Sequence, residues 1–442
     1  MSDVQSRRSF LHRAIAAGVL LPAGGLLAQE DARKKRREAR RNRPVKQDAP
    51  SERLNLGIIG VAGRGGENLH EVSSQNIVVL CDVDRSRLAE AKKVHPQAHA
   101  YTDFRRLLDH TELDAIVVST PDHMHAIPAY RALKLGLHVY CEKPLAHTVA
   151  EVRALRKAAA ESRCATQMGT QIHAGENYRR VVEIVKSGQL GEIRRVHVWM
   201  GGRPIPGKRV AEGTPPEHVD YDLWLGPAPY RPYHPSHFHY NWRYWFDFGG
   251  GILADFGCHF MDLPHWALDL RAPASVEATG VKDYEGDNDV PGKQQVEYRY
   301  PARGDLPPVH LTWYSGGLRP KGAEKFGKDS AVLFEGEKGR LVADYGSRKF
   351  YFDDGRAEPA APPKTIADSV GHHREWIEAI RSGGRTTCNF DYSGALAESV
   401  LLGNVALRAG KKLEWDMEGG RVTNCAEAAQ YVDKEYRKGW GL

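Results

Sequence analysis

The stretch Leu54-Asn55-Leu56-Gly57-Ile58-Ile59-Gly60-Val61-Ala62-Gly63-Arg64-Gly65 decides the fold of this chain. Its first half is a short apolar run typical of a buried strand, and its second half is a glycine-rich turn. A helical pattern begins at Glu67, directly after the turn. A strand, a turn of this kind and a helix are typical of the first unit of a parallel α/β sheet whose helix start binds phosphate.

Each small residue of this turn has an expected role. Gly60 permits the tight turn, Ala62 and Gly63 let the backbone approach a pyrophosphate, and Gly65 allows close packing of helix on strand. The pattern reads G-x-A-x-x-G, with alanine where the fingerprint more often has a second glycine. One added methyl group is compatible with pyrophosphate binding.

The next strand supplies a carboxylate. The apolar run Ile77–Cys81 ends at Asp82, 22 residues after Gly60, close to the roughly 20 residues expected for an acid that binds a ribose 2′-hydroxyl. A carboxylate repels a 2′-phosphate, so NAD is favoured over NADP. The nearby Arg64, Arg85 and Arg87 keep NADP as the alternative.

Strands and helices continue to alternate up to residue 168. We expect helices at 84–94, 103–108 (capped by Thr102), 126–135 and 149–161, and strands at 114–119, 137–141 and 165–168. This order predicts a Rossmann domain over residues 51–172.

Two strand ends carry polar residues. Thr120-Pro121-Asp122-His123-Met124-His125 follows one strand, and Glu142-Lys143-Pro144 follows the next. The carboxyl ends of parallel strands are where ligands bind. Lys143 is therefore placed where a cofactor and a substrate could meet, although Glu142 and Lys143 alone could equally form a surface salt bridge.

Residues 173–442 have a different pattern. Alternating strands dominate, at 192–199, 274–281, 294–300, 309–314, 331–335 and 341–343, with few helices between them. This predicts a substrate-binding α+β domain with a large, mostly antiparallel sheet that is open on one face. A late helix at 391–408 is expected to pack back towards the Rossmann domain.

Two segments of this second half carry chemistry. Asp255 and His259 are i and i+4 on an expected helix, so the carboxylate could hold the imidazole tautomer and bring its pKa towards neutrality. The alternative is a helix cap and a core histidine.

The second segment, 234–245, is rich in aromatic side chains that could stack on sugar faces or simply pack on the body of the protein. Its candidate substrate-binding residues are His237, His239, Tyr240, Trp242 and Arg243.

A metal site is the weaker interpretation of this second segment. His237 and His239 could ligate a metal together with Asp262, but two close histidines are weak evidence and we expect no metal.

Three motifs in order, the Gly60–Gly65 turn, Thr120-Pro121-x-x-x-His125 and Gly136-x-His138-Val139-x-Cys141-Glu142-Lys143-Pro144, resemble the Gfo/Idh/MocA family of oxidoreductases. The resemblance covers most of the chain after residue 51 and implies an active site between the Rossmann domain and the open-faced sheet. Asp255 and His259 match the family's Asp-x-x-x-His pair, which the resemblance implies is catalytic with Lys143. It implies that the cofactor is held by Gly60, Ala62, Gly63, Arg64, Gly65, Asp82, Thr120, Pro121, His125, Glu142 and Lys143.

The function implied is hydride transfer between a sugar or cyclitol carbinol and a nicotinamide cofactor. His259 would take the hydroxyl proton, Asp255 would orient His259, and Lys143 would hydrogen-bond the carbinol oxygen. One alternative, also present in the family, is a glycoside hydrolase or lyase that oxidises its substrate transiently and retains NAD. Another is a non-catalytic sugar-binding module.

The N-terminal region predicts export. Ser6-Arg7-Arg8-Ser9-Phe10-Leu11, followed by an apolar run and small residues near Ala28, resembles a twin-arginine signal peptide over residues 1–28; an ordinary basic signal peptide is the alternative. Residues 29–50 read as a basic, disordered linker. We expect a periplasmic or cell-envelope protein without a stable membrane span, which either holds its cofactor tightly or recycles it in each turnover.

Composition sets further limits. The net charge of +6 arises in residues 1–50, which hold 12 Lys and Arg against 5 Asp and Glu, so the rest of the chain is near neutral and does not suggest nucleic-acid binding. The six cysteines form no C-x-x-C pair, which favours buried free thiols. The open sheet face needs cover, so we expect a homodimer or homotetramer.

Overall fold

The computed structural model describes residues 53–203, 205 and 211–442. The predicted signal peptide (residues 1–28) and the whole of the predicted basic linker (residues 29–50) lie outside these residues.

The first domain is built on a six-stranded, entirely parallel sheet. In sheet order its strands are β3 (His99–Tyr101), β2 (Asn76–Cys81), β1 (Asn55–Ile59), β4 (Ala115–Val118), β5 (His138–Cys141) and β6 (Thr166–Met168). The predicted Rossmann sheet is confirmed. The sequence did not reveal β3, because this three-residue edge strand is partly exposed and lacks an apolar run.

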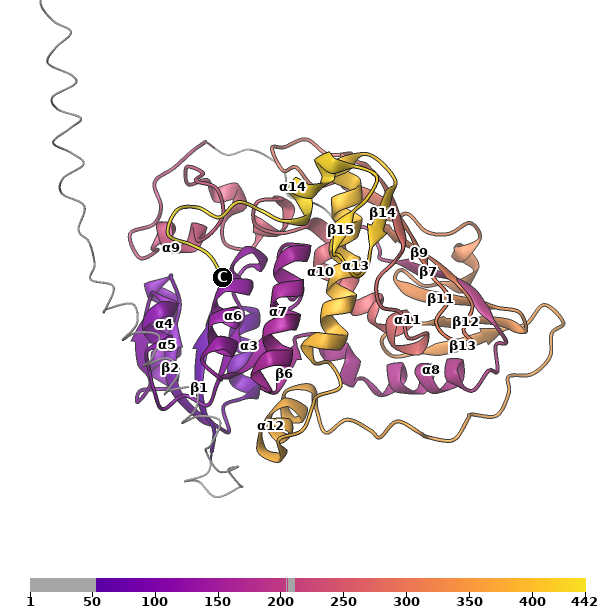
Figure 1. Ribbon diagram of the computed structural model, residues 1–442, viewed down its shortest axis with the longest axis horizontal. Helices are drawn as coiled ribbons and strands as arrows, with labels where there is room; N and C mark the ends of the chain where they lie inside the picture. Colours follow the sequence, from indigo (N-terminus) through magenta and orange to yellow (C-terminus); the bar gives the residue numbers. More distant parts are fainter. Residues whose placement is uncertain (1–52, 204, 206–210) are drawn as a thin grey trace, which may run out of the picture. The chain divides into compact units, whose positions relative to one another are not determined.

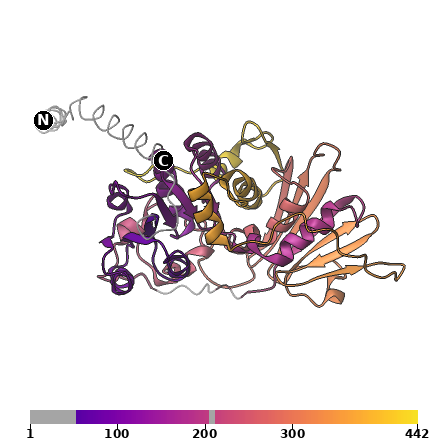
Figure 2. The same ribbon diagram turned by 90° about the horizontal axis from the view of Figure 1, so that it is seen from below.

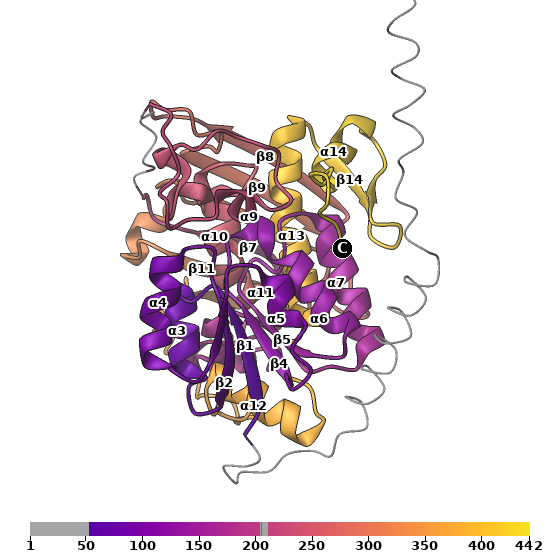
Figure 3. The same cartoon turned by 90° about the vertical axis from the view of Figure 1, so that its left-hand side faces the viewer.

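Helices cover both faces of this sheet. They are α3 (Arg64–Glu71), α4 (Arg85–Val94), α5 (Phe104–Leu108), α6 (Ala126–Lys134) and α7 (Val149–Ser162). Figure 3 shows α3 and α4 on one side of the strands and α5, α6 and α7 on the other. The expected cap of α5 was wrong by one residue: the side chain of Asp103, not Thr102, accepts a hydrogen bond from the backbone N–H of Arg105.

The second domain contains a nine-stranded sheet, antiparallel except where β7 pairs with β10. In sheet order the strands are β13 (Arg348–Tyr351), β12 (Gly339–Ala343), β11 (Ala331–Gly336), β7 (Ile193–Trp199), β10 (Val309–Ser315), β9 (Lys293–Tyr300), β8 (Ser275–Val281), β14 (Leu413–Asp416) and β15 (Arg421–Val422). The predicted, mostly antiparallel sheet is thus confirmed. Burial alternates along β9, with Val296 and Tyr298 inside and Lys293 and Arg299 outside, so this strand is polar on its outer face.

Helices of the second half pack against both domains. They are α8 (Glu176–Lys186), α9 (Tyr221–Leu225), α10 (Gly251–Phe260), α11 (Asp262–Ala267), α12 (His372–Ser382), α13 (Phe390–Ala409) and α14 (Ala429–Val432). In Figures 1 and 2, α13 lies between the Rossmann domain and the large sheet. Its buried Glu398 accepts hydrogen bonds from Arg153 (2.9 Å) and Arg156 (3.4 Å) of α7. No helix among the described residues has the length and apolar character needed to span a membrane.

Candidate active site

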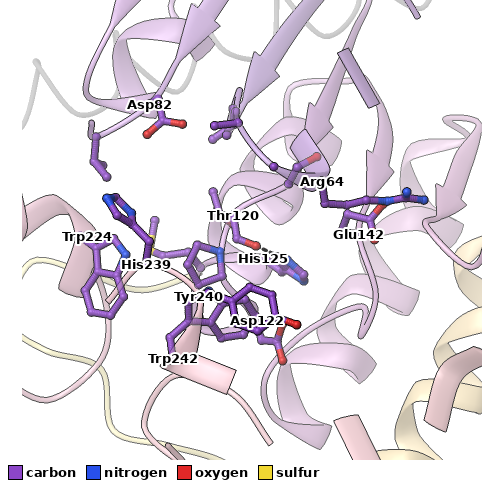
Figure 4. Close-up of a pocket in the computed structure, with 18 of the residues that line it drawn as sticks. Arg64, Asp82, Thr120, Asp122, His125, Glu142, Trp224, His239, Tyr240 and Trp242 are labelled. Atoms are coloured by element: carbon purple, nitrogen blue, oxygen red, sulfur yellow. Dashed lines mark hydrogen bonds and ion pairs between the residues drawn. The ribbon is translucent and has the colours of Figure 1, made fainter. Parts of the chain in front are cut away.

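A cavity of about 690 Å³ lies at the carboxyl ends of the Rossmann strands and is lined by both domains. Figure 4 shows Asp82 and His239 towards one end, Arg64 and Glu142 towards the other, and Thr120 with His125 between them. This position is the one expected for ligand binding in a parallel sheet.

The glycine turn has the geometry that its sequence predicts. Gly60 has a φ of +83°, and a Cβ there would lie 2.5 Å from the carbonyl oxygen of Ser119. A Cβ on Gly65 would lie 2.2 Å from the carbonyl oxygen of Gly60, so only glycine lets α3 start this close to β1. Gly63, with a φ of +56°, lines the cavity together with Ala62 and caps α3 without any side chain. The bare start of a helix facing a cavity fits a pyrophosphate.

Asp82 is fixed at the cavity wall. Its carboxylate accepts hydrogen bonds from the backbone N–H groups of Val61 and Asp84, each 3.0 Å long. Burial raises its pKa above the usual value. The turn and this acid are therefore held together, as the recognition of a nucleotide ribose requires, and the described residues fit a dinucleotide.

The arginines near Asp82 already have acidic or carbonyl partners. Arg87 pairs with Asp84 at 3.5 Å, Arg64 pairs with Glu142 at 3.3 Å, and the guanidinium of Arg85 hydrogen-bonds the carbonyl oxygen of Glu217.

Glu142 joins several elements behind the cavity. Its Oε1 accepts hydrogen bonds from Asn68 and Gln171, both at 2.9 Å, in addition to Arg64. A Cβ on Gly169, the residue after β6, would lie 2.5 Å from the same oxygen, so the end of β6 packs directly against this carboxylate. The neighbouring Lys143 is thereby held on a rigid strand end.

His125 connects the two polar strand ends. Its Nδ1 lies 2.7 Å from the carbonyl oxygen of Pro144 and its Nε2 lies 2.8 Å from that of Thr120. Burial lowers its pKa. The structure brings Thr120, Pro121 and His125 to the cavity wall, where His125 links their loop to the one that presents Lys143.

Lys143 contacts Asp255 of α10 at the cavity wall. Its Nζ lies 2.5 Å from Asp255 Oδ1 and 2.6 Å from the main-chain oxygen of the same residue. Burial opposes both charges, but their mutual attraction outweighs it: the pKa of Lys143 is raised, and that of Asp255 falls to about 2, with Arg243 contributing. The two groups are therefore a charged pair over the whole physiological pH range.

His259 lies one helical turn after Asp255 and also lines the cavity. Its Nδ1 is buried and has no hydrogen-bond partner among the described residues. Burial and the nearby Lys143 lower its pKa to about 3, and the opposing effect of Asp255 is smaller. The expectation that Asp255 orients His259 and brings its pKa towards neutrality is wrong, because the carboxylate of Asp255 is held by Lys143 and by Arg243, 3.4 Å away.

The aromatic segment divides between the cavity and the core. His239, Tyr240, Trp242 and Arg243 line the cavity. His239 lies near Asp82 in Figure 4, and its Nε2 is 3.2 Å from a carboxylate oxygen of Asp84, which places it at the predicted ribose end, away from Glu142.

The position of His237 contradicts its predicted substrate-binding role and the weaker interpretation of this segment as a metal site. His237 does not line the cavity; it is buried and its Nε2 lies 2.9 Å from the hydroxyl of Tyr221. Asp262 pairs instead with His173, at 3.0 Å. These side chains therefore have separate partners, and over residues 53–203, 205 and 211–442 no group of three His, Cys, Asp or Glu could hold a metal ion.

Some cavity residues were not predicted. Asp122 lies in the quoted strand-end loop, and burial raises its pKa to about 8. Gln171, Trp224 and Trp440 also line the cavity. The position of Asp122 after a strand was a usable signal, whereas no local motif surrounds Trp440.

The chain belongs to the Gfo/Idh/MocA oxidoreductase family. The family model described as "Oxidoreductase family, NAD-binding Rossmann fold" matches residues 54–170, and that described as "Oxidoreductase family, C-terminal alpha/beta domain" matches residues 184–442. The resemblance seen in the three motifs is therefore confirmed, and the first domain is the family's NAD-binding domain.

Relatives of known sequence match the chain in part. An inositol 2-dehydrogenase of Salmonella typhimurium is 27% identical over 172 residues, which is 38% of this chain and 50% of that protein. A glycosyl hydrolase family 109 protein of Solibacter usitatus is 31% identical over 206 residues, 43% of this chain and 44% of that protein. The chain thus spans about half the length of the curated relatives that it matches.

Solved structures share the fold over most of the chain. The WlbA dehydrogenase from Bordetella pertussis, solved with NADH and UDP-GlcNAcA, is 18% identical with a TM-score of 0.60, over 83% of this chain and 99% of that one. An aldose-aldose oxidoreductase from Caulobacter crescentus, complexed with glycerol, is 17% identical with a TM-score of 0.53, over 82% of this chain and 99% of that one.

Proposed function

We propose that this protein transfers a hydride between a sugar or cyclitol carbinol and a tightly held nicotinamide cofactor. The observation that carries the proposal is the 2.5 Å contact of Lys143, from the Rossmann domain, with Asp255 of α10, in a cavity that His259 of the same helix also lines. The inositol 2-dehydrogenase relative and the sugar-related structural neighbours agree with this substrate class.

Each side chain has a distinct role. The neutral imidazole of His259 accepts the hydroxyl proton, and the ammonium of Lys143 hydrogen-bonds the carbinol oxygen and stabilises the charge that develops there. Asp255 is a positioning residue for Lys143, which it holds at 2.5 Å. When bound, the nicotinamide supplies the hydride acceptor. Tyr240, Trp242 and Arg243 border the space left for the substrate.

NAD is favoured over NADP. The half-buried carboxylate of Asp82 would repel a 2′-phosphate at the ribose end of the cavity, and Arg64 and Arg87, which line it, are already paired with acids.

The test is turnover under anaerobic conditions with NAD and a panel of cyclitols, aldoses and glycosides. Net NADH formation supports the dehydrogenase. Lys143→Met should lower the rate at least 100-fold while NAD still binds, because one proton-transfer or charge-stabilising group contributes about 10²–10⁴-fold. Near-normal turnover in that variant would overturn the assignment.

A second candidate is an NAD-retaining glycoside hydrolase or lyase, favoured by the similarity to the glycosyl hydrolase family 109 protein. Cleaved glycoside without net NADH would identify it in the same assay. Binding without any conversion would instead indicate a sugar-binding module.

Export and assembly remain parts of the proposal. The arginine pair at positions 7 and 8 with its apolar run supports twin-arginine export to the periplasm or cell envelope, and fractionation of cells expressing the full chain tests it.

A homodimer or homotetramer through the large sheet is expected because the outer face of an open sheet needs cover. Light scattering of the purified protein tests this assembly.

A further inference from the structure

Residues 433–442 run across the Rossmann domain beside the cavity. In Figure 1 this segment leaves α14, passes α9 and ends near the top of α6. Lys434 Nζ pairs with the buried Glu151 at the start of α7 at 2.9 Å, and Arg131 of α6 donates a 3.1 Å hydrogen bond to the carbonyl oxygen of Gly441. The segment is therefore attached to two helices of the Rossmann domain.

The same segment is also attached to α9 and to the turn that follows it. Arg437 Nε donates a 2.9 Å hydrogen bond to the carbonyl oxygen of Gly226, and its Nη2 donates one of 2.7 Å to that of Asp222. The backbone N–H of Arg437 donates to the carbonyl oxygen of Pro227 at 3.1 Å. We name residues 433–442 the strap, because they link α6 and α7 to α9 beside the cavity.

Trp440 is the strap residue that lines the cavity. Its ring centre lies 6.3 Å from that of Phe104, and the guanidinium carbon of Arg105 lies 5.2 Å from the same ring. The wall at this point also contains Thr102 and Asp103, at the start of α5. These residues follow β3, the strand beside β2, so Trp440 lies on the side of the cavity that Asp82 marks as the ribose end.

We propose that Trp440 and Phe104 form the wall against which the purine base of the dinucleotide lies, and that the strap slows release of the cofactor. The inference rests on the proposed function, because it takes NAD as the occupant. A purine has two apolar faces, and aromatic rings are the side chains that bind such faces. Since the strap is fixed on both sides of Trp440, a departing dinucleotide has to displace the indole or its attachments.

The occupant of this wall is the nucleotide base and not the sugar substrate. Lys143, which contacts Asp255, follows β5, and three strands separate β5 from β3 in the sheet. Trp440 instead contacts Phe104 of α5, which follows β3. A strap that retains the cofactor also agrees with an exported enzyme, for which a lost cofactor is not replaced.

The experiment compares how tightly the full-length protein binds the two halves of the cofactor, one with the purine base and one with the nicotinamide. Isothermal titration measures the Kd of NADH, ADP-ribose and nicotinamide mononucleotide, and stopped-flow fluorescence measures NADH release. Trp440→Ala should raise the Kd of NADH and ADP-ribose about tenfold, as expected for loss of one base–aromatic contact, and leave that of nicotinamide mononucleotide unchanged. Trp440→Phe should restore most of the affinity.

Two further variants control for structural damage. Tyr230→Ala removes another aromatic ring, 72% exposed and not part of the cavity wall, and should change none of the constants. Arg437→Gln keeps the indole of Trp440 but removes hydrogen bonds that attach the strap, so NADH release should accelerate. This variant tests the strap even if Trp440→Ala does not fold.

The outcomes separate the two proposals. Unchanged binding of ADP-ribose by folded Trp440→Ala, unchanged NADH release by Arg437→Gln, or equal weakening of nicotinamide mononucleotide would overturn the strap inference while the proposed function stands. Absence of NADH binding by the unmodified protein would overturn both.

Discussion

Replacing Asp255 by asparagine removes one charge from the pair that joins the two domains and keeps the size of the side chain. The pair is only about 15% exposed and its N–O distance is 2.5 Å. Folded Asp255 has a pKa of about 2 in place of the usual 3.8, which corresponds to about 2.5 kcal/mol of stability at pH 7. Asp255→Asn should lose roughly this amount, because the ammonium of Lys143 is left buried without its counter-charge.

The direction of the pKa shift determines how the stability difference between the two proteins changes with pH. A folded pKa below the unfolded one means that the stabilisation is complete above about pH 4 to 5 and is lost as the pH falls through the folded value of about 2. The difference between the unmodified protein and Asp255→Asn should therefore shrink from about 2.5 kcal/mol at pH 7 to about 1.3 kcal/mol at pH 3.

Urea unfolding at several pH values, followed by circular dichroism, measures this difference. Asp353→Asn is the control, since its carboxylate is 85% exposed and its ion pair with Arg340 is expected to contribute less than about 1 kcal/mol. An Asp255→Asn protein as stable as the unmodified one at pH 7, or a difference that does not change with pH, would refute the reasoning.

Three further predictions concern the cofactor turn and the base. Gly65→Ala should abolish NADH binding in titration calorimetry, because its Cβ would meet the Gly60 carbonyl oxygen at 2.2 Å; Gly346→Ala, with open space around its Cβ, should bind normally. Asp82→Ala should lower the ratio of the Kd for NADP to the Kd for NAD about tenfold, because the carboxylate that repels the 2′-phosphate is gone. An unchanged ratio would contradict the role of Asp82 in selecting NAD. Because the pKa of His259 is about 3, its basic form persists down to about pH 4, so kcat should show no acid limb near pH 6.5, and a limb there that disappears in His259→Gln would contradict this assignment.

Much of the Rossmann domain could be predicted because its signals are local. The conformations of Gly60 and Gly65, the placing of Asp82 at the end of β2 and the polar strand ends follow from contacts between residues close in sequence or on adjacent strands. The sheet of the second domain was predictable for the same reason, from the alternation of its strands, while the short β13, β14 and β15 were too brief to show a period.

The partners of side chains far apart in the sequence were decided only by the tertiary structure. Helical spacing placed Asp255 beside His259, but a lysine 112 residues away takes its carboxylate, because an ammonium in a buried site attracts a carboxylate more strongly than a neutral imidazole does. His237 is in the core and His239 is at the cavity for a similar reason: neighbouring residues in a loop face different surroundings.

The sequence by itself thus predicted the parallel Rossmann sheet, its glycine turn, the mostly antiparallel second sheet and many of the side chains that line the cavity. The tertiary structure alone decided which of them act on one another, and it alone brought Trp440 to the cofactor cavity, 297 residues after Lys143 at the strand end of β5. Local backbone geometry and periodicity are encoded over a few residues, whereas charge pairing and burial depend on which surfaces the folded chain brings together.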